Sequence, residues 1–83
     1  MRLKLRYFAS IRETIGVSVE ALDTRASTLA DLRDELIARG GAHAESLARG
    51  RAVRMALNQL MCDETVTLED GAEVAFFPPV TGG

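Results

Sequence analysis

The apolar residues of this chain change their spacing twice, and these changes limit the folds that it can adopt. Over residues 3–8 and 17–22 apolar residues alternate with polar ones, which is typical of strands with one buried face. Residues 29–37 instead place apolar side chains at i, i+3, i+7 and i+8, which is one face of a helix. Alternation returns over 53–62 and 73–77. The order therefore predicts two strands, a helix and then further strands.

This order favours an α+β domain with one mixed sheet of four to five strands and one main helix packed on one face of the sheet. The first two strands follow each other closely and should be antiparallel. Residues 9–16 read as a connecting loop with room for a short helical turn, and 42–49 as a weaker second helix. The expected core side chains are Leu3, Leu5, Val19, Leu29, Leu32, Leu36, Ile37, Val53, Met55, Leu57, Val74 and Phe76.

Local signals predict where these elements begin and end. Thr28 with Asp31 is a capping pair for the helix, and Gly40-Gly41 stops it because glycine accepts the left-handed conformation. Asn58-Gln59 is a candidate two-residue turn, although glycine would suit its second position better. Asp70-Gly71 is a further turn signal before the last strand. Pro78-Pro79 ends that strand, because proline cannot donate to a sheet.

The same alternation predicts large apolar side chains on the open face of the sheet. Phe8 continues the outward positions of the first strand, and Phe77 those of the last strand. A two-residue turn at 58–59 places Met61 on the same side. Adjacent apolar side chains on an exposed face mark a partner-binding surface. The alternative is that loops cover them or that a strand end changes their direction.

The composition disfavours several classes of function. A chain of 83 residues is one small domain with a modest core and little room for a deep active-site cleft. Ten basic and twelve acidic residues give a net charge of −2, which disfavours general nucleic-acid binding. The single cysteine, Cys62, allows no internal disulfide and fits a reducing compartment. Since a membrane span and a signal peptide are both missing from the pattern, we expect a cytoplasmic protein with no membrane or nucleic-acid partner.

The sequence offers no convincing catalytic group or metal site. His43 lies between small residues with no evident partner, so we expect it to be exposed or structural. Cys62 is expected to point inward as a small buried side chain. No motif for a metal, a phosphate or a dinucleotide is present. The basic row 2, 4 and 6 on the open face is either a solubilising surface or a means of attracting an acidic partner.

The C-terminal tail is the unusual feature. It consists of the run Pro78-Pro79-Val80-Thr81-Gly82-Gly83. Prolines extend the exit from the sheet, and an end without side chains can enter a channel too narrow for a Cβ atom. Six extended residues reach at most ~20 Å, which is enough to enter a neighbouring active site. The Gly83 carboxylate is a poor electrophile until it is activated, for example as an acyl-adenylate. The alternative is a frayed terminus without a function.

Together these residues resemble the small, sulfur-carrying subunit of molybdopterin synthase, a member of the β-grasp, ubiquitin-like family. The ending Phe76-Phe77-Pro78-Pro79-Val80-Thr81-Gly82-Gly83 is the most specific part of the resemblance. Supporting segments are Tyr7-Phe8-Ala9, Arg12-Glu13, Ala56-Leu57-Asn58-Gln59 and Leu68-Glu69-Asp70-Gly71. The resemblance spans nearly the whole chain, with residues 40–52 matching loosely and Leu60 standing where relatives are often polar. It implies a β-grasp domain over 1–77 and a flexible, extended tail over 78–83.

The resemblance also implies a mechanism. The Gly83 carboxylate, next to Gly82, would be adenylated by an E1-like activating enzyme that uses ATP, and sulfur from a persulfide sulfurtransferase would make it a thiocarboxylate. The carrier would then deliver sulfur to cyclic pyranopterin monophosphate inside the large synthase subunit. Catalytic side chains would belong to that large subunit, in a heterotetramer, and the small subunit would be no enzyme by itself and would bind no cofactor.

The family pattern also assigns the residues that contact the large subunit. They are Phe8, Arg12, Met61, Phe77, Pro78, Pro79, Val80 and Thr81. Phe8, Met61 and Phe77 in this set are the residues that the alternation alone places on the open face.

Three alternatives stay open at this point. One is a sulfur carrier for another pathway, such as thiamin thiazole or cysteine formation, for which the Phe-Phe-Pro-Pro segment is atypical. Another is a ubiquitin-like modifier that becomes joined to lysines. The last is a β-grasp binding module whose tail has no chemical role.

Overall fold

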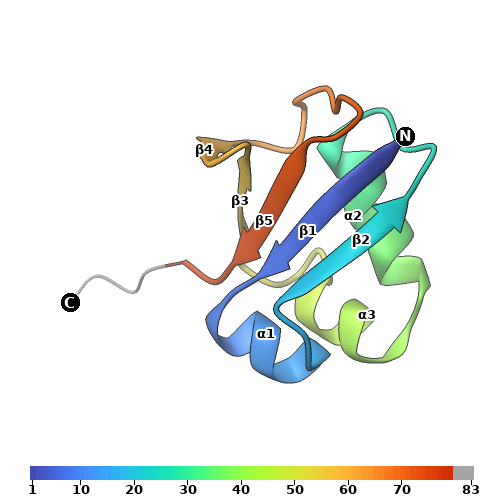
Figure 1. Ribbon diagram of the computed structural model, residues 1–83. Helices are drawn as coiled ribbons and strands as arrows, with labels where there is room; N and C mark the ends of the chain where they lie inside the picture. The colour runs from blue at the N-terminus through green and yellow to red at the C-terminus, as the bar shows by residue number, and fades with distance from the viewer. Residues whose placement is uncertain (80–83) are drawn as a thin grey trace.

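Five strands form one mixed sheet, in which the first and the last strand of the chain lie side by side (Figure 1). The structure is a computed structural model that describes residues 1–79. The strands are β1 (Arg2–Tyr7), β2 (Val19–Asp23), β3 (Arg54–Leu57), β4 (Leu60–Cys62) and β5 (Glu73–Phe77), in the order β2-β1-β5-β3-β4. β1 and β5 are parallel, and the other neighbours are antiparallel. This arrangement confirms the predicted β-grasp fold.

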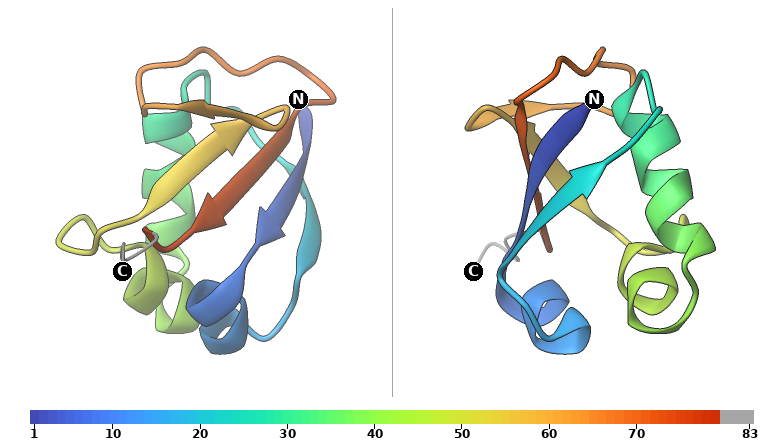
Figure 2. Two further views of the ribbon diagram at one scale, coloured as in Figure 1. Left: turned by 90° about the vertical axis from the view of Figure 1, so that its left-hand side faces the viewer. Right: turned by 45° about the vertical axis from the view of Figure 1, so that its right-hand side comes forward.

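Helices cover one face of the sheet and leave the other open (Figure 2). Helix α2 (Leu29–Ala38) crosses the covered face, while α1 (Ala9–Ile15) and α3 (Gly41–Leu47) lie together at one end of the molecule. The sequence led us to expect one main helix, and α2 is that helix. None of the helices within residues 1–79 is long and apolar enough to cross a membrane.

The core lies between α2 and the inner face of the sheet. Leu29, Leu32 and Leu36 project from α2 at helical spacing and are fully buried. They pack with strand residues in one cluster, which buries apolar area from both layers. The cluster comprises Leu3, Leu5, Tyr7, Ile11, Ala26, Leu29, Leu32, Leu36, Leu47, Met55, Leu68, Ala72, Val74 and Phe76. The helix begins where predicted, because the Asp31 N–H donates to Thr28 Oγ1 at 3.2 Å.

The predicted turn between β3 and β4 is confirmed by its backbone angles. Asn58 has φ 50° and Gln59 has φ 70°, so both central residues are left-handed, as in the turns that suit the twist of a hairpin. The Asn58 side chain also accepts a hydrogen bond from the Glu73 N–H, which ties the turn to β5. The turn fixes the register that places Met61 opposite Ala56.

Two expectations about the first third of the chain need correction. The short helical turn expected within the loop 9–16 is a complete helix, α1, since Ile11 is buried and Gly16, at φ 94°, ends it. Val19 is not a core residue: it is 46% exposed, because Arg6, an outward position of β1, pairs with it. The inward positions of β2 are Glu20 and Leu22.

Glu20 is the centre of a polar cluster at the edge of the sheet. The Tyr7 hydroxyl donates to Glu20 at 2.9 Å, Arg39 donates to it at 2.5 Å, and His43 Nε2 lies 3.4 Å away. Burial alone would raise the pKa of the Glu20 carboxyl, but the Arg39 and Tyr7 hydrogen bonds outweigh burial and lower it. Burial and the neighbouring Glu20 raise the pKa of Tyr7. His43 thus has a partner that the sequence did not reveal.

Candidate partner-docking surface

Phe8 and Phe77 meet on the open face of the sheet. Phe8 follows β1 directly and Phe77 is the last residue of β5, so the parallel pairing of these strands brings the two residues to the same end. The Phe8 N–H donates to the Phe76 carbonyl at 3.1 Å and continues that pairing. The two rings contact edge to face, with their centroids 6.3 Å apart. The structure thus brings together two of the three predicted aromatic and apolar positions.

Met61 extends this surface across the sheet. The strand register aligns Ala75, Ala56 and Met61 in one row on the open face. Ala75 and Ala56 are 9% and 6% exposed, whereas Met61 is 53% exposed. We call Phe8, Ala56, Met61, Ala75 and Phe77 the apolar patch. Its placement agrees with the sequence, and its role in binding stays a prediction.

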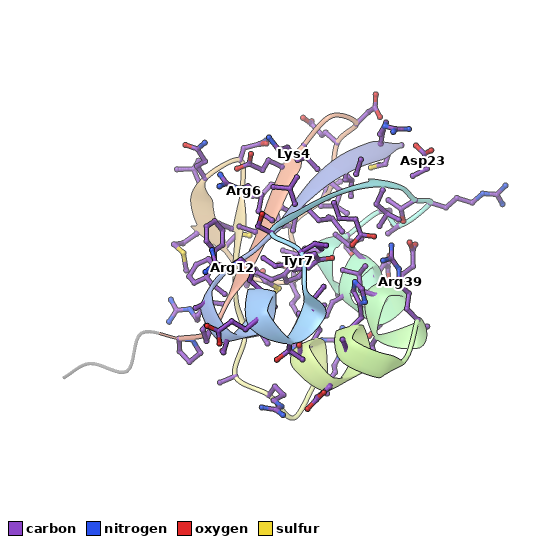
Figure 3. All side chains as sticks on the ribbon, turned by 60° about the horizontal axis from the view of Figure 1, so that its bottom comes forward. Lys4, Arg6, Tyr7, Arg12, Asp23 and Arg39 are labelled. Atoms are coloured by element: carbon purple, nitrogen blue, oxygen red, sulfur yellow. The ribbon has the colours of Figure 1, made fainter. Side chains whose placement is uncertain are left out.

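Arginines surround the apolar patch. The guanidinium of Arg6 lies over the Phe8 ring, 5.1 Å from its centroid. Arg12 is exposed on α1, one turn after Phe8, and lies with Arg6 on the side from which the tail leaves (Figure 3). Arg54 pairs across the strands with Phe77. Sequence analysis did not select Arg54, although it stands two residues before Ala56 and alternation places both on the open face.

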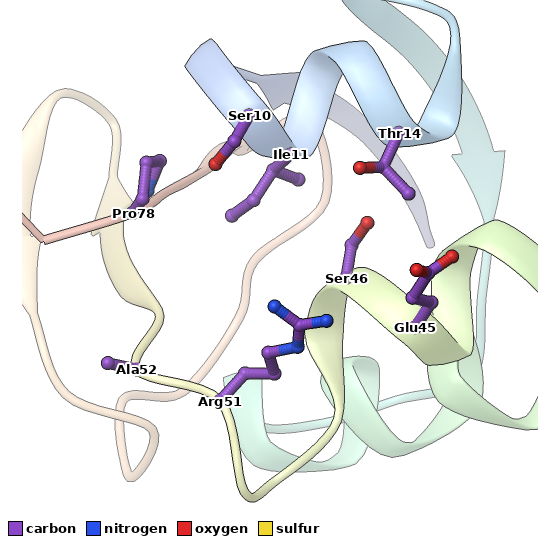
Figure 4. Close-up of a pocket in the computed structure, with 8 residues that line it drawn as sticks. All are labelled: Ser10, Ile11, Thr14, Glu45, Ser46, Arg51, Ala52 and Pro78. Carbon is purple, nitrogen blue, oxygen red and sulfur yellow. The ribbon is translucent and has the colours of Figure 1, made fainter.

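The tail leaves the body beside a small cleft (Figure 4). Pro78 forms one wall, α1 and α3 form two others, and the chain at 51–52 completes it. The lining residues are Ser10, Ile11, Thr14, Glu45, Ser46, Arg51, Ala52 and Pro78. Pro78 and Pro79 are half-buried at the start of the tail. The remaining predicted tail residues, Val80, Thr81, Gly82 and Gly83, lie outside the described residues.

The other candidate chemical groups are held in structural positions. Cys62 packs partly against the core, and burial, with the charge of Asp63, raises the pKa of its thiol. A raised thiol pKa leaves little of the nucleophilic thiolate at neutral pH. His43 contributes to the Glu20 cluster at the opposite side of the sheet from the apolar patch. Within residues 1–79 no group of His, Cys, Asp or Glu side chains is arranged to hold a metal ion.

Comparison with known proteins places this sequence in a family. The sequence model of the ThiS family matches residues 5–83. A molybdopterin synthase sulfur carrier subunit from Haemophilus influenzae is 37% identical over 81 residues, which is 98% of this chain and 99% of that protein.

Two solved structures with similar folds are described as subunits of molybdopterin-converting factors. A putative molybdopterin converting factor, subunit 1, from Pyrococcus furiosus superposes with a TM-score of 0.79 at 27% identity, over 96% of this chain and 99% of that one. A chain from the complex of subunits 1 and 2 of the molybdopterin-converting factor of Helicobacter pylori gives a TM-score of 0.71 at 28% identity, over 100% of both chains. This chain therefore belongs to the ThiS family, and molybdopterin synthase sulfur carrier subunits are among its relatives.

Proposed function

We propose that this chain is the sulfur carrier subunit of a molybdopterin synthase. The observation that carries the proposal is the 37% identity, over nearly the full length of both proteins, to a carrier subunit of that enzyme. The geometry supports it, because Phe77 belongs to the apolar patch and leads directly into Pro78 and the tail. A partner bound to the patch would therefore receive the tail at its own surface.

The proposed chemistry takes place at the terminal carboxylate of Gly83. In the first step the carboxylate attacks the α-phosphorus of ATP on an E1-like activating enzyme, and pyrophosphate leaves. The outer sulfur of a persulfide donor then displaces AMP and forms an acyl disulfide. A second thiol attacks the donor's sulfur, which releases the thiocarboxylate and leaves the donor in a disulfide with that thiol. Gly82 and Gly83 have no side chains, so this end can enter a narrow active site. The thiocarboxylate would finally transfer its sulfur to cyclic pyranopterin monophosphate.

The proposal divides the work between two subunits. The large subunit supplies the catalytic side chains and the substrate site. This chain supplies the reactive end and the surface that positions it, with Phe8, Met61, Phe77 and Arg12 in contact with the large subunit. The H. pylori complex of subunits 1 and 2 is a precedent for such a pair. We expect two carriers on a dimer of large subunits, and no cofactor bound by the carrier itself.

Intact-mass analysis after reaction with the activating enzyme, ATP and a sulfur donor tests the chemistry. The expected result is a mass gain equal to the difference between one sulfur and one oxygen atom. Oxidation of any of the three methionines adds nearly the same mass. Fragmentation must therefore locate the gain at Gly83, and a chain without Gly83 serves as the control.

The same experiment separates the alternative functions. Covalent ladders on other proteins, formed in place of the sulfur-bearing species, would support a modifier. An unchanged mass under conditions in which a known carrier is converted would contradict a carrier function. Sulfur at Gly83 with no transfer in the presence of the large subunit would point to a different sulfur pathway.

A further inference from the structure

The open face of the sheet carries a positive charge that the chain as a whole does not have. The strand register places four basic and two acidic side chains on this face. These residues are Arg2, Lys4, Arg6, Arg54, Asp23 and Glu73. The whole chain has a net charge of −2, so its charges are unevenly distributed. The electrostatic field of such a face attracts an approaching partner whose surface is negatively charged.

The carboxylates of this face leave the arginines beside the apolar patch largely unneutralised, because Asp70, like Asp23, lies at the end where Arg2 stands. Asp23 pairs with Arg2 at 3.2 Å, at the end of the sheet far from Phe8. Glu73 lies 3.9 Å from Arg6, which is a long contact for an ion pair. Arg54 forms no ion pair with any other residue of the described part of the chain. Arg54 and, in part, Arg6 are therefore available to a partner.

These two arginines border the aromatic rings of the patch. Arg54 stands opposite Phe77 in the strand register, and Arg6 lies over the ring of Phe8. The ring of Phe8 holds Arg6 in place, which reduces the rotamer entropy that Arg6 loses on binding a partner. A guanidinium matches the two oxygens of a carboxylate better than an ammonium does. The rim of the patch is thus built for acidic side chains.

We propose that the protein which docks on the apolar patch presents carboxylates to Arg6 and Arg54. We take that protein to be the large synthase subunit, so this inference rests on the proposed function. The apolar centre supplies most of the affinity, and the two arginines raise the association rate and disfavour partners with a basic rim. Charges at the rim of an interface act mainly on association, because they remain near solvent and attract the partner before contact.

Stopped-flow association of the full chain with the large subunit tests the inference. Arg6→Gln and Arg54→Gln should each slow association about threefold or more at low salt, and the difference should vanish at high salt. Arg25→Gln is the matched control. Arg25 is exposed, follows β2 at the far end of the sheet, and its replacement changes the net charge equally.

A second variant separates charge from packing. Arg6→Lys keeps the positive charge beside Phe8 and should retain most of the association rate. If Arg6→Lys is as slow as Arg6→Gln, the effect comes from packing and the charge inference is wrong. Equal slowing by Arg25→Gln and the other Gln variants would also overturn it, because net charge alone would explain the rates.

The experiment distinguishes this inference from the proposed function. If Phe77→Asp abolishes binding while the arginine variants match the control, docking on the apolar patch is supported. The proposed carboxylates of the large subunit opposite Arg6 and Arg54 are then rejected. If the unaltered chain does not bind the large subunit at all, the proposed partner is wrong, and the inference that depends on it is overturned as well.

Discussion

Phe77 is the residue at which the sheet, the docking surface and the tail meet. It ends β5, its ring contacts Phe8 on the open face, and Pro78 follows it. Its side chain is only half-buried, so the chain does not need it for the core. An aromatic ring kept at such a position is better explained by binding than by folding.

Replacing Phe77 by Asp is expected to weaken binding to the large subunit by ~2 kcal/mol or more, the scale of an interface anchor. The reason is that the substitution removes the ring and places a charge in the apolar patch. Isothermal calorimetry measures the affinity, with Ala38→Asp as control, since Ala38 is exposed on α2, on the other side of the sheet from the apolar patch. An unchanged affinity in Phe77→Asp would remove this residue from the interface.

A second residue-scale prediction concerns the turn at 58–59. Gln59 has φ 70°, a left-handed conformation that costs a side-chain-bearing residue about 1 kcal/mol or more. Gln59→Gly should therefore raise the free energy of unfolding by up to about 1 kcal/mol, after the extra backbone entropy of glycine is subtracted. Urea unfolding measures the change. Gly50→Ala, at an uncrowded position without a positive φ, is a control that should change stability little, and a less stable Gln59→Gly chain would contradict the strain argument.

At this scale, the alternation of apolar and polar residues predicted the direction of side chains well wherever a strand began at the expected residue. It placed Phe8, Met61 and Phe77 on the open face, as the register confirms. It failed for Val19, because alternation turns the apolar positions 17, 19 and 21 inward, whereas in the edge strand β2 the inward position is Glu20. The Tyr7–Glu20 hydrogen bond, which favours the observed direction, joins residues that sequence periodicity cannot connect.

At the scale of elements, β2 shows how an edge strand can carry a charge on its inner side. Glu20 points toward the helices, and Tyr7, Arg39 and His43 surround it from β1, the end of α2 and α3. A partly buried carboxylate is tolerated when hydrogen bonds replace its water. The Glu20 cluster therefore joins the sheet edge to α2 and α3, and α3 also lines the cleft beside Pro78.

The Glu20 cluster predicts a pH dependence of stability. Because the folded pKa of Glu20 lies below its ordinary value of 4.5, its contribution is complete above that pH and is lost as pH falls below it. Glu20→Gln should lower stability at pH 7 by about 1 kcal/mol, through weaker hydrogen bonds from Arg39 and Tyr7. It should also make the decline below pH 4.5 shallower than in the unaltered chain.

Urea unfolding at pH 7 and at several values below 4.5 measures both effects. Glu13→Gln, on the exposed side of α1, is the control and should follow the unaltered chain. Parallel pH profiles for the unaltered chain and Glu20→Gln would show that Glu20 does not carry this dependence.

The helices differ in how far sequence could predict them. Helix α2 carries a full apolar stripe and a Thr28 cap, so its start was clear from local signals. Helix α1 has seven residues and only Ile11 and Ile15 to mark its inner side, which is too short a pattern to distinguish from a loop. The burial of Arg33 could not be predicted from the sequence either. Arg33 donates to the carbonyls of Leu47 and Ala48, and these contacts depend on where α3 ends.

At the scale of the whole molecule, the fold brings the docking surface and the start of the tail to one end of the sheet. The core residues lie between Leu3 and Phe76, so no described residue of the tail contributes to the core. The body and the tail are thus separable, and the sequence-based division at residue 77 remains a prediction that a truncation can test.

Deleting Gly83 is expected to abolish sulfur transfer while leaving the melting temperature unchanged, since the core ends before the tail. Product formation with the large subunit and calorimetric melting measure the two properties. Gly50→Ala is a control that should keep both, because a Cβ at Gly50 meets nothing within 4 Å. Full activity in the truncated chain would contradict the proposed chemistry at Gly83.

The parallel pairing of β1 with β5 has a consequence for biosynthesis. A nascent chain leaving the ribosome makes β1 first, yet the neighbour of β1 at the centre of the sheet is the last strand to be translated. Until then one backbone edge of β1 stays unsatisfied and β3 has no link to it. Products that terminate before β5 therefore cannot complete the sheet, and they cannot display Phe8 beside Phe77. The order of synthesis itself keeps fragments that lack β5, and with it the tail, from competing for the partner.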